Sequence, residues 1–247
     1  MIDRLVSECE AVRTVRGRSA SLEADRTVVE ALTDAVATTG VPAIRAWTPH
    51  RQVAFGRRDA RADGYERARQ RAEAHGYPPI ERSVGGRAVA YTGSTVAFAV
   101  IVPTPTPRRG TGARYDAATT GVVRALRSLG VPARRGEPDA SFCPGEHSVQ
   151  ARGKISGLAQ RIQRETARVS GIVVVDAHEE LAAVLDDVYD ALDVPFDPDS
   201  VGSVARGGGP ADPDAVVDAV FDSFCGDLSR ESTTVAEVLA DSEDAAF

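Results

Sequence analysis

The sequence predicts an α+β fold, in which helices flank a largely antiparallel mixed sheet. Two observations favour this class: helix-like and strand-like segments follow one another irregularly, and two pairs of strand-like segments are close enough to form hairpins. A parallel sheet would instead require strands and helices to alternate regularly. The 247 residues suit one domain with appendages, or one domain and a small second one.

Helices are expected where apolar residues recur three and four positions apart, or where strong helix formers are concentrated. The first such segment ends at Gly40, which Pro42 follows, and this combination typically stops a helix. The last has leucines and valines opposite acidic residues, as in an amphipathic helix. The predicted helices span residues 21–40, 64–77, 113–131 and 178–194.

Strands are expected where short runs of β-branched and other apolar residues lie between turn residues. Two short candidates, at residues 42–47 and 51–56, are joined by the turn-like sequence Thr-Pro-His. Longer runs on either side of a turn predict hairpins. The predicted hairpins span residues 88–103, with the turn at 92–94, and residues 154–176.

The composition changes after the last of these helices. Residues 195–212 are rich in proline, glycine and aspartate, which is typical of a linker. Two acidic segments with helical character follow. We therefore expect a main domain at residues 1–194, a linker at residues 195–212 and an acidic helical tail at residues 213–247.

Composition limits the classes of partner. The net charge of −7 argues against extended nucleic-acid binding. No stretch approaches the roughly 20 apolar residues that span a bilayer, and the first residues lack the apolar run of a secretory signal. We expect a cytoplasmic protein, taken as a monomer, with neither nucleic acid nor a membrane as its partner.

The cysteines and histidines predict neither a disulfide framework nor a metal site. Cys9, Cys143 and Cys225 are odd in number and widely spaced, and the four histidines are scattered. Cys143 differs from the other two because Pro144 and Gly145 follow it, which places it in a turn. Cys9 and Cys225 are the better candidates for inert thiols.

Lys154 is the only lysine in the chain, which otherwise uses arginine for its basic residues. Gly153 and Gly157 lie close to it, and glycines allow a backbone to pass near a ligand. A lysine ammonium is also a compact charge whose pKa shifts readily on burial, unlike that of arginine. Codon usage alone would leave a lone lysine anywhere on the surface, so this position favours a functional role.

Two further clusters contain residues suited to chemistry. Gly85 and Gly86 permit backbone N–H groups to approach an anion or a carbonyl, although the chain has no phosphate-loop motif. Cys143 would react as a thiolate, and Lys154 or His147 could supply the cation that favours it or accept its proton. A protease-like pair of Cys143 with His147 is not favoured, because no orienting acid is evident.

Together these clusters resemble the lipoate-protein ligase and octanoyl/lipoyl transferase family, which shares its fold with biotin protein ligase. The resemblance covers roughly residues 20–190 and implies a biotin/lipoate protein ligase-like catalytic domain over residues 1–194. The matching elements, in the family's order, are residues 45–57, which look like its first hairpin, then Arg82-x-x-Gly85-Gly86-x-Ala88-Val89, and finally Gly153-Lys154-x-x-Gly157-x-Ala159-Gln160-Arg161.

The resemblance implies a role for residues of each element. In this family the lysine of the Gly-Lys element contacts the acyl carbonyl, which makes Lys154 a candidate catalytic residue. Cys143, eleven residues earlier in Cys-Pro-Gly, is similar to the cysteine that forms an acyl-thioester in the amidotransferase branch. The implied substrate-binding residues are Arg82, Gly85, Gly86, Arg87, Ala88, Gly153, Gly157 and Ala159.

The resemblance also implies substrates and partners. A cysteine acyltransferase of this family would move an octanoyl or lipoyl group onto lysines of lipoyl carrier domains, and it would need no cofactor. These carriers are the glycine cleavage H protein and the acyltransferase subunits of 2-oxoacid dehydrogenases. Candidates to line an acyl slot, for each of which core packing is the more frequent role, are Val84, Val89, Ala97 and Phe98.

Three alternatives stay open. An ATP-dependent lipoate ligase, which uses ATP and magnesium, typically has a third glycine and a His-Asp pair where this chain has Arg87, Tyr91 and Thr92. An octanoyl transferase working from acyl carrier protein would also use a cysteine. A non-catalytic relative would bind the acyl chain or the carrier alone. A biotin ligase is disfavoured, because its usual Gly-Arg-Gly-Arg stretch is missing.

Overall fold

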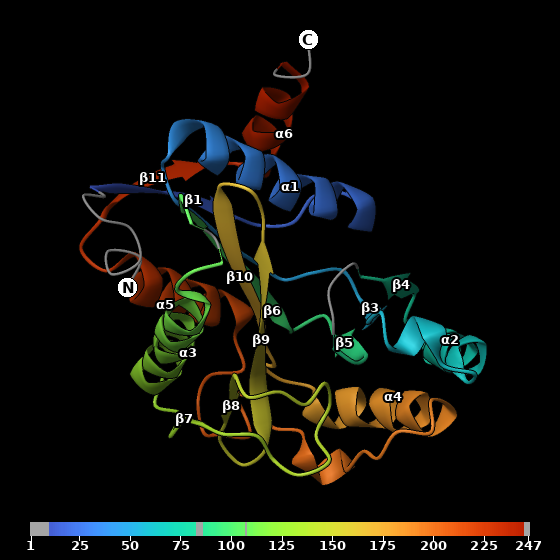
Figure 1. The fold of residues 1–247 in the computed structure, drawn as a ribbon. Helices are drawn as coiled ribbons and strands as arrows, with labels where there is room; N and C mark the ends of the chain where they lie inside the picture. Colours follow the sequence, from blue (N-terminus) through green and yellow to red (C-terminus); the bar gives the residue numbers. More distant parts are fainter. Residues whose placement is uncertain (1–9, 83–85, 107, 245–247) are drawn as a thin grey trace.

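A computed structural model describes residues 10–82, 86–106 and 108–244 of the chain. Its main sheet has eight strands in the order β11-β1-β2-β6-β10-β9-β8-β7 (Figure 1). These strands are β1 (Ala11–Arg16), β2 (Ala43–Trp47), β6 (Val96–Pro103), β7 (Arg134–Arg135), β8 (Ser148–Gln150), β9 (Lys154–Ile162), β10 (Thr166–Val173) and β11 (Ser229–Thr233).

A second sheet of three strands lies beside the main one, in the order β4-β3-β5. Its strands are β3 (Gln52–Phe55), β4 (Pro79–Glu81) and β5 (Val89–Tyr91). The helices are α1 (Leu22–Thr39), α2 (Tyr65–Ala74), α3 (Thr111–Ser128), α4 (His178–Ala191), α5 (Pro213–Cys225) and α6 (Val235–Asp244), with short 3-10 turns at Asp59–Arg61 and Pro198–Ser200.

The strand pairing confirms the predicted fold class. Among the described strands, β11–β1, β1–β2 and β3–β4 pair in parallel, and the remaining neighbours are antiparallel. The central strand β6 is buried along all but its last residue, as its continuous apolar run requires. The structure is therefore an α+β fold around a largely antiparallel mixed sheet.

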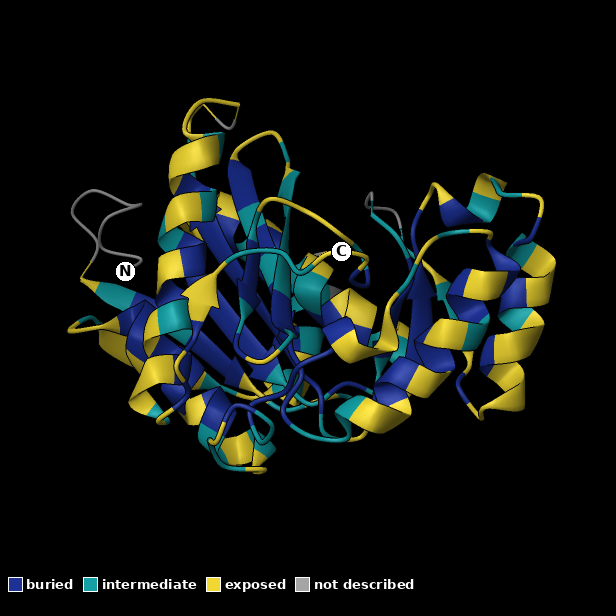
Figure 2. Cartoon of the chain, turned by 90° about the horizontal axis from the view of Figure 1, so that it is seen from below, coloured by how far each residue is buried: buried dark blue, intermediate teal, exposed yellow. Residues whose placement is uncertain are grey.

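The helices cover the sheets in three groups. α3 and α5 pack on the main sheet and share one apolar core with it, while α1 and α6 pack together over a second core (Figure 1). α2 and α4 pack against each other and against the small sheet. Figure 2 shows the strands largely buried and the outward sides of the helices exposed.

The predicted helices are all present. α1 begins after Ser21, whose side chain accepts from the backbone N–H of Ala24, and ends at Gly40 in the left-handed region with φ of 72°. The backbone N–H of Gly40 donates to the carbonyl of Val36, so at both ends a contact satisfies a backbone group that the helix leaves free. The stop signal read from the sequence therefore works as expected.

Of the strand pairs expected from the sequence, only one hairpin is confirmed. β9 and β10 pair antiparallel, with residues 156–162 opposite residues 167–173. The pair at residues 45–57 and the pair at residues 88–103 are wrong as hairpins, because in each case one strand joins the main sheet and the other joins the small sheet. A local turn pattern shows that the chain changes direction, but it does not show which distant strand each run will pair with.

The segment at residues 195–212 differs from the expected linker. Val201, Ser203 and Val204 are fully buried, and the backbone N–H of Gly202 donates to the carbonyl of Lys154 at 2.9 Å. The region beyond it is also part of the fold, since α5 lies in the main core and β11 extends the main sheet. The glycines and prolines here allow a tight path against the core.

No helix among the described residues combines the length and the apolar character needed to cross a membrane.

Candidate active site

Cys143 lies in the long loop between β7 and β8 and has an unusual backbone conformation. Its φ is +41°, in the left-handed region that side-chain-bearing residues rarely adopt. Such a conformation costs on the order of 1–3 kcal/mol and persists only where surrounding contacts enforce it, most often at functional sites. The contacts that enforce it here come from three separate parts of the chain.

The peptide groups of Cys143 are bound on both sides. Its backbone N–H donates to the hydroxyl of Tyr189 at 2.6 Å, and that hydroxyl donates onward to the carbonyl of Ala88 at 3.0 Å. Its own carbonyl accepts from Lys154 Nζ at 2.9 Å. Tyr189 belongs to α4 and Lys154 begins β9, so the turn is fixed between a helix and the main sheet.

The Cys143 thiol faces a cation and a backbone donor. Sγ lies 3.4 Å from Arg82 Nη2 and 3.4 Å from the backbone nitrogen of Arg87. Burial tends to lower the pKa of Arg82, but the negative charges available at Cys143 and Tyr91 raise it overall. A guanidinium and a backbone N–H therefore both donate toward the sulfur and fix its position.

Gly86 has no room for a side chain at this point. Its φ is +97°, and a Cβ there would lie 2.8 Å from Cys143 Sγ and 2.9 Å from Arg82 Nη2. Gly56 fits closely behind it, since a Cβ on Gly56 would lie 2.0 Å from the Gly86 carbonyl oxygen. Both positions therefore require glycine so that the backbone can reach the thiol.

Lys154 is fully buried beneath the cysteine loop. Its ammonium contacts both carboxylate oxygens of Glu137, at 2.9 and 3.1 Å, and the carbonyls of Phe142 and Cys143, each at 2.9 Å. Burial lowers the pKa of Lys154, and the charges of Glu137 and Cys143 offset that shift in part. In this structure the lysine holds the loop that presents the thiol.

A comparison with protein families decides the identity of the fold. The family model for the lipoyl protein ligase A/B catalytic domain matches residues 21–225. The chain belongs to this family.

Two relatives of this lipoyl protein ligase A/B member carry transferase names. An octanoyl-[GcvH]:protein N-octanoyltransferase of Exiguobacterium sibiricum is 31% identical over 153 residues, which are 60% of this chain and 52% of the relative. An octanoyltransferase LipM of Kyrpidia tusciae is 29% identical over 197 residues, 67% of this chain and 72% of the relative. The chain spans about half the length of the curated relatives with the first name.

Solved structures of the lipoyl protein ligase family share the fold. Lipoate-protein ligase A bound with ATP superposes with a TM-score of 0.75 at 19% identity, covering 96% of this chain and 93% of that one. Protein Ta0514 of T. acidophilum with bound lipoic acid gives 0.68 at 18% identity, covering 96% and 95%. At these identities the likeness shows the fold alone, and it confirms the fold expected from the sequence.

Among the predicted site residues of this lipoyl ligase-like fold, several meet at the thiol. Arg82, Gly86 and Arg87 surround Sγ as described, and Ala88 contributes the carbonyl that Tyr189 contacts. The side chain of Arg87 turns away to the buried carboxylate of Asp59, 3.1 Å from its Oδ1. Gly85, and Val84 beside it, lie outside the described residues.

The two glycines of the Gly-Lys element differ in how closely other atoms approach them. A Cβ on Gly153 would lie 2.6 Å from the backbone nitrogen of Gly202, so glycine is needed where residues 200–202 cross. A Cβ on Gly157 would lie 3.4 Å from the Lys154 side chain, an ordinary contact distance. Ala159 pairs with Ser170 in the β9–β10 hairpin. Their predicted substrate contacts stay a prediction.

Other candidates are placed away from the thiol chemistry. The ring of His147 stacks on that of Tyr115 of α3, with 3.8 Å between the ring centroids. Cys225 is buried in the main core, where burial raises the pKa of its thiol, whereas Cys9 lies outside the described residues. Val89, Ala97 and Phe98 are buried in the apolar cores, which agrees with the role judged more frequent for them.

Four residues around the thiol were missed by the sequence reasoning. The Gly56-Arg57 pair at the end of the matched segment 45–57 was a usable signal for Gly56. Asp59, Glu137 and Tyr189 gave none, because an isolated acid or tyrosine has no pattern. Their contacts depend on chain crossings that only the folded structure reveals.

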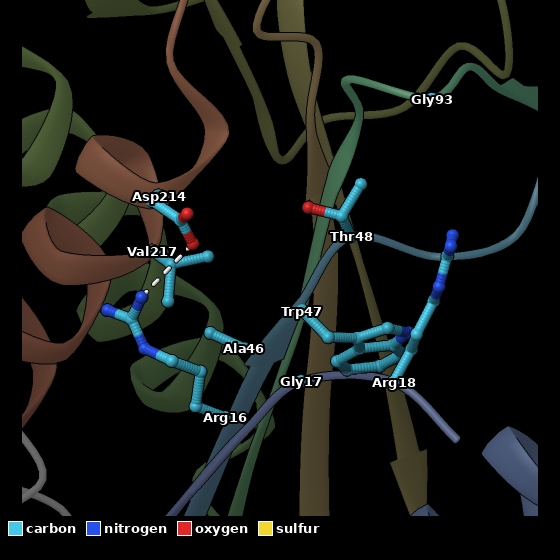
Figure 3. Close-up of a pocket in the computed structure, with 9 residues that line it drawn as sticks. All are labelled: Arg16, Gly17, Arg18, Ala46, Trp47, Thr48, Gly93, Asp214 and Val217. Carbon is cyan, nitrogen blue, oxygen red and sulfur yellow. Dashed lines mark hydrogen bonds and ion pairs between the residues drawn. The ribbon is translucent and has the colours of Figure 1, made fainter. Parts of the chain in front are cut away.

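Two surface pockets lie elsewhere. One, of about 280 Å³, opens where the ends of β1 and β2 meet the start of α5, and there Arg16 contacts Asp214 at 3.1 Å (Figure 3). Neither pocket is lined by Cys143 or Lys154, so neither contains the candidate nucleophile. The second, of about 540 Å³, is lined by Thr106, Arg108, Arg109, Ile162, Gln163 and Arg164.

Proposed function

We propose that this protein is an acyltransferase that carries an octanoyl or lipoyl group on Cys143 and passes it to a lysine of a carrier domain. The observation that carries the proposal is the position of Cys143 Sγ, 3.4 Å from both the Arg82 guanidinium and the Arg87 backbone nitrogen. The relatives named as octanoyltransferases make octanoyl the first acyl group to test.

The first half of the reaction forms a thioester. The Cys143 sulfur attacks the acyl carbonyl of the donor, the new S–C bond forms, and the bond from the acyl carbon to the donor nitrogen breaks. The donor lysine leaves as an amine that carries the proton from the thiol. Splitting amide exchange into two acyl transfers is the usual benefit of covalent catalysis.

Donors for the developing oxyanion are present beside the sulfur. The Arg87 backbone N–H points at Sγ, and Arg82 Nε is buried with no hydrogen-bond partner among the described residues. A buried donor without a partner carries an energetic penalty that a substrate oxygen would relieve. We assign these two groups to the acyl oxygen, where preorganised donors stabilise the tetrahedral intermediate.

The second half of the reaction releases the acyl group. The nitrogen of an acceptor lysine attacks the thioester carbon, the S–C bond breaks, and the proton lost by the amine returns to Cys143. We take lipoyl carrier domains as both donor and acceptor, with an octanoylated glycine cleavage H protein as the first donor. Neither half requires a cofactor, and a cytoplasmic location is part of the same proposal.

An ATP-dependent ligase reaction fits these residues less well. Lys154, which the resemblance places against the acyl carbonyl, is bound to Glu137 and to two loop carbonyls. Arg87 and Thr92 are engaged with Asp59 and with Thr95 respectively. The transferase route uses the groups that remain available at the thiol.

The test is direct observation of the intermediate. Purified protein is incubated with octanoylated carrier domain without ATP, quenched in acid and measured as an intact mass. We expect an added octanoyl group that hydroxylamine removes and that the Cys143→Ser variant does not acquire. Carrier modification that appears only with ATP and free acid would establish a ligase instead, and binding without either product would leave a non-catalytic relative.

A further inference from the structure

Glu137 is the residue on which the contacts of the cysteine loop converge. Its carboxylate accepts from Lys154 Nζ on both oxygens, from the Ser141 hydroxyl, and from the backbone N–H of Gly145 at 3.1 Å. Ser141 precedes Cys143 by two residues and Gly145 follows it by two. The carboxylate therefore joins the residues on either side of Cys143, and the candidate nucleophile lies between the two joined points.

Glu137 also provides the counter-charge for Lys154. The lysine side chain is fully buried, whereas that of Glu137 is 24% exposed, and the two are 2.9 Å apart. A buried ammonium without an acid beside it would lose its proton, because burial disfavours the charged form. A neutral amine donates more weakly than an ammonium, so its hydrogen bonds to the carbonyls of Phe142 and Cys143 would lose the strength that the charge gives them.

We infer that Glu137 is a positioning residue for the thioester chemistry, acting through Lys154, Ser141 and Gly145 to keep Cys143 in its left-handed conformation. This inference rests on the proposed function. Loss of the carboxylate releases the carbonyl of Cys143, the turn relaxes from φ of +41°, and Sγ leaves the two donors that face it. Within the described residues, Glu137 has no hydrogen bond to the sulfur or to either of its donors.

The test compares Glu137→Gln with Glu180→Gln. Both substitutions replace an ion-paired carboxylate by a neutral amide of the same shape, and Glu180 is paired with Arg51, far along α4 from Tyr189. For each variant we would measure the thermal midpoint, the rate of thioester formation, and the rate of Cys143 alkylation by iodoacetamide across pH. Peptide mass mapping assigns the alkylation to Cys143 and not to the other cysteines.

Glu137→Gln should slow the alkylation of Cys143 by about tenfold across the pH range measured, because the relaxed turn carries Sγ away from the guanidinium and the N–H that donate to it. It should also slow thioester formation about tenfold, because the sulfur is no longer held where it attacks the acyl carbonyl. Glu180→Gln should leave both rates unchanged. Glu137→Asp keeps the charge and should recover part of both lost rates. An ion pair that served stability alone would affect neither rate.

An unchanged alkylation profile in Glu137→Gln would overturn the inference. If Glu137→Gln does not fold, Ser141→Ala removes a single contact to the carboxylate and should shift the alkylation profile in the same direction by less. A Ser141→Ala protein with the wild-type profile would then count against the inference. Alkylation needs no acyl donor, so a wild-type protein that forms no thioester would refute the proposed function without deciding the role of Glu137.

Discussion

Lys154 Nζ donates to the carbonyl oxygen of Cys143 over 2.9 Å, so the only lysine of the chain holds the backbone of the candidate nucleophile. The family resemblance implies contact of Lys154 with the acyl carbonyl, whereas this structure shows contact with the loop. A compact cation with several donors suits either role. The two roles differ in how removal of the lysine should affect the stability of the folded protein.

Lys154→Met should reduce the free energy of unfolding as well as abolish thioester formation. Removing one partner of a buried ion pair costs about 3 kcal/mol or more, because the remaining charge is left without compensation. Urea denaturation measures the change. Arg16→Met is the control, since the pairs of Arg16 with Asp214 and Asp218 are exposed and should contribute about 1 kcal/mol or less. Equal losses of unfolding free energy in the two variants would contradict a stabilising role for the buried Lys154–Glu137 pair.

Arg82→Gln should slow the alkylation of Cys143 at neutral pH by about tenfold, because it removes the charged donor that contacts Sγ. The amide keeps polar atoms in place but carries no charge. Arg134→Gln removes an exposed arginine whose contact is with Gln150, and its alkylation rate should match the wild type. An Arg82→Gln protein with wild-type thiol reactivity would remove Arg82 from the role of charge partner.

Gly86→Ala should abolish thioester formation, and Gly76→Ala should not. Both glycines have positive φ, so each substitution introduces backbone strain of about 1–2 kcal/mol. A Cβ at Gly86 would also lie 2.8 Å from Sγ, whereas nothing lies within 4 Å of one at Gly76. Single-turnover rates and thermal midpoints of the two variants separate the strain, which they share, from the steric block, which is specific to Gly86.

Titration of Lys154 should affect how both thioester formation and the free energy of unfolding depend on pH. Burial lowers the pKa of this lysine, so as pH rises its ammonium loses its proton before an ordinary lysine would, and thioester formation should decline with it. Between the lowered pKa and the ordinary value of about 10.4, the unfolded chain binds more protons than the folded one. The contribution of Lys154 to the free energy of unfolding therefore rises with pH in that window while activity falls.

This pair of opposite trends is measurable. Urea midpoints of the wild type and of Lys154→Met, taken at matched pH values, isolate the part of the stability change that belongs to the lysine. A difference that falls with pH in this window would contradict the lowered pKa. An activity that persists up to the ordinary lysine pKa would contradict the need for the charged form.

The sequence predicts much of the site, because its motifs record local requirements. Gly86 must be glycine to let its backbone reach the thiol, and Cys143 must tolerate a tight turn, so both leave a visible pattern. Glu137 and Tyr189 leave none, since Tyr189 meets Cys143 from a helix 46 residues away. The same reason explains the two wrong hairpins, whose turns are local while their strand partners are distant.

The burial of Lys154 has a consequence for the acyl transfer that we propose. A thioester poised to acylate lysine amines will acylate any exposed lysine near it, including those of its own chain. This chain has one lysine in its whole sequence, and that side chain is fully buried with its ammonium bound to Glu137 and loop carbonyls. Under the proposed function, these residues offer no exposed lysine at which the thioester would be lost to self-modification.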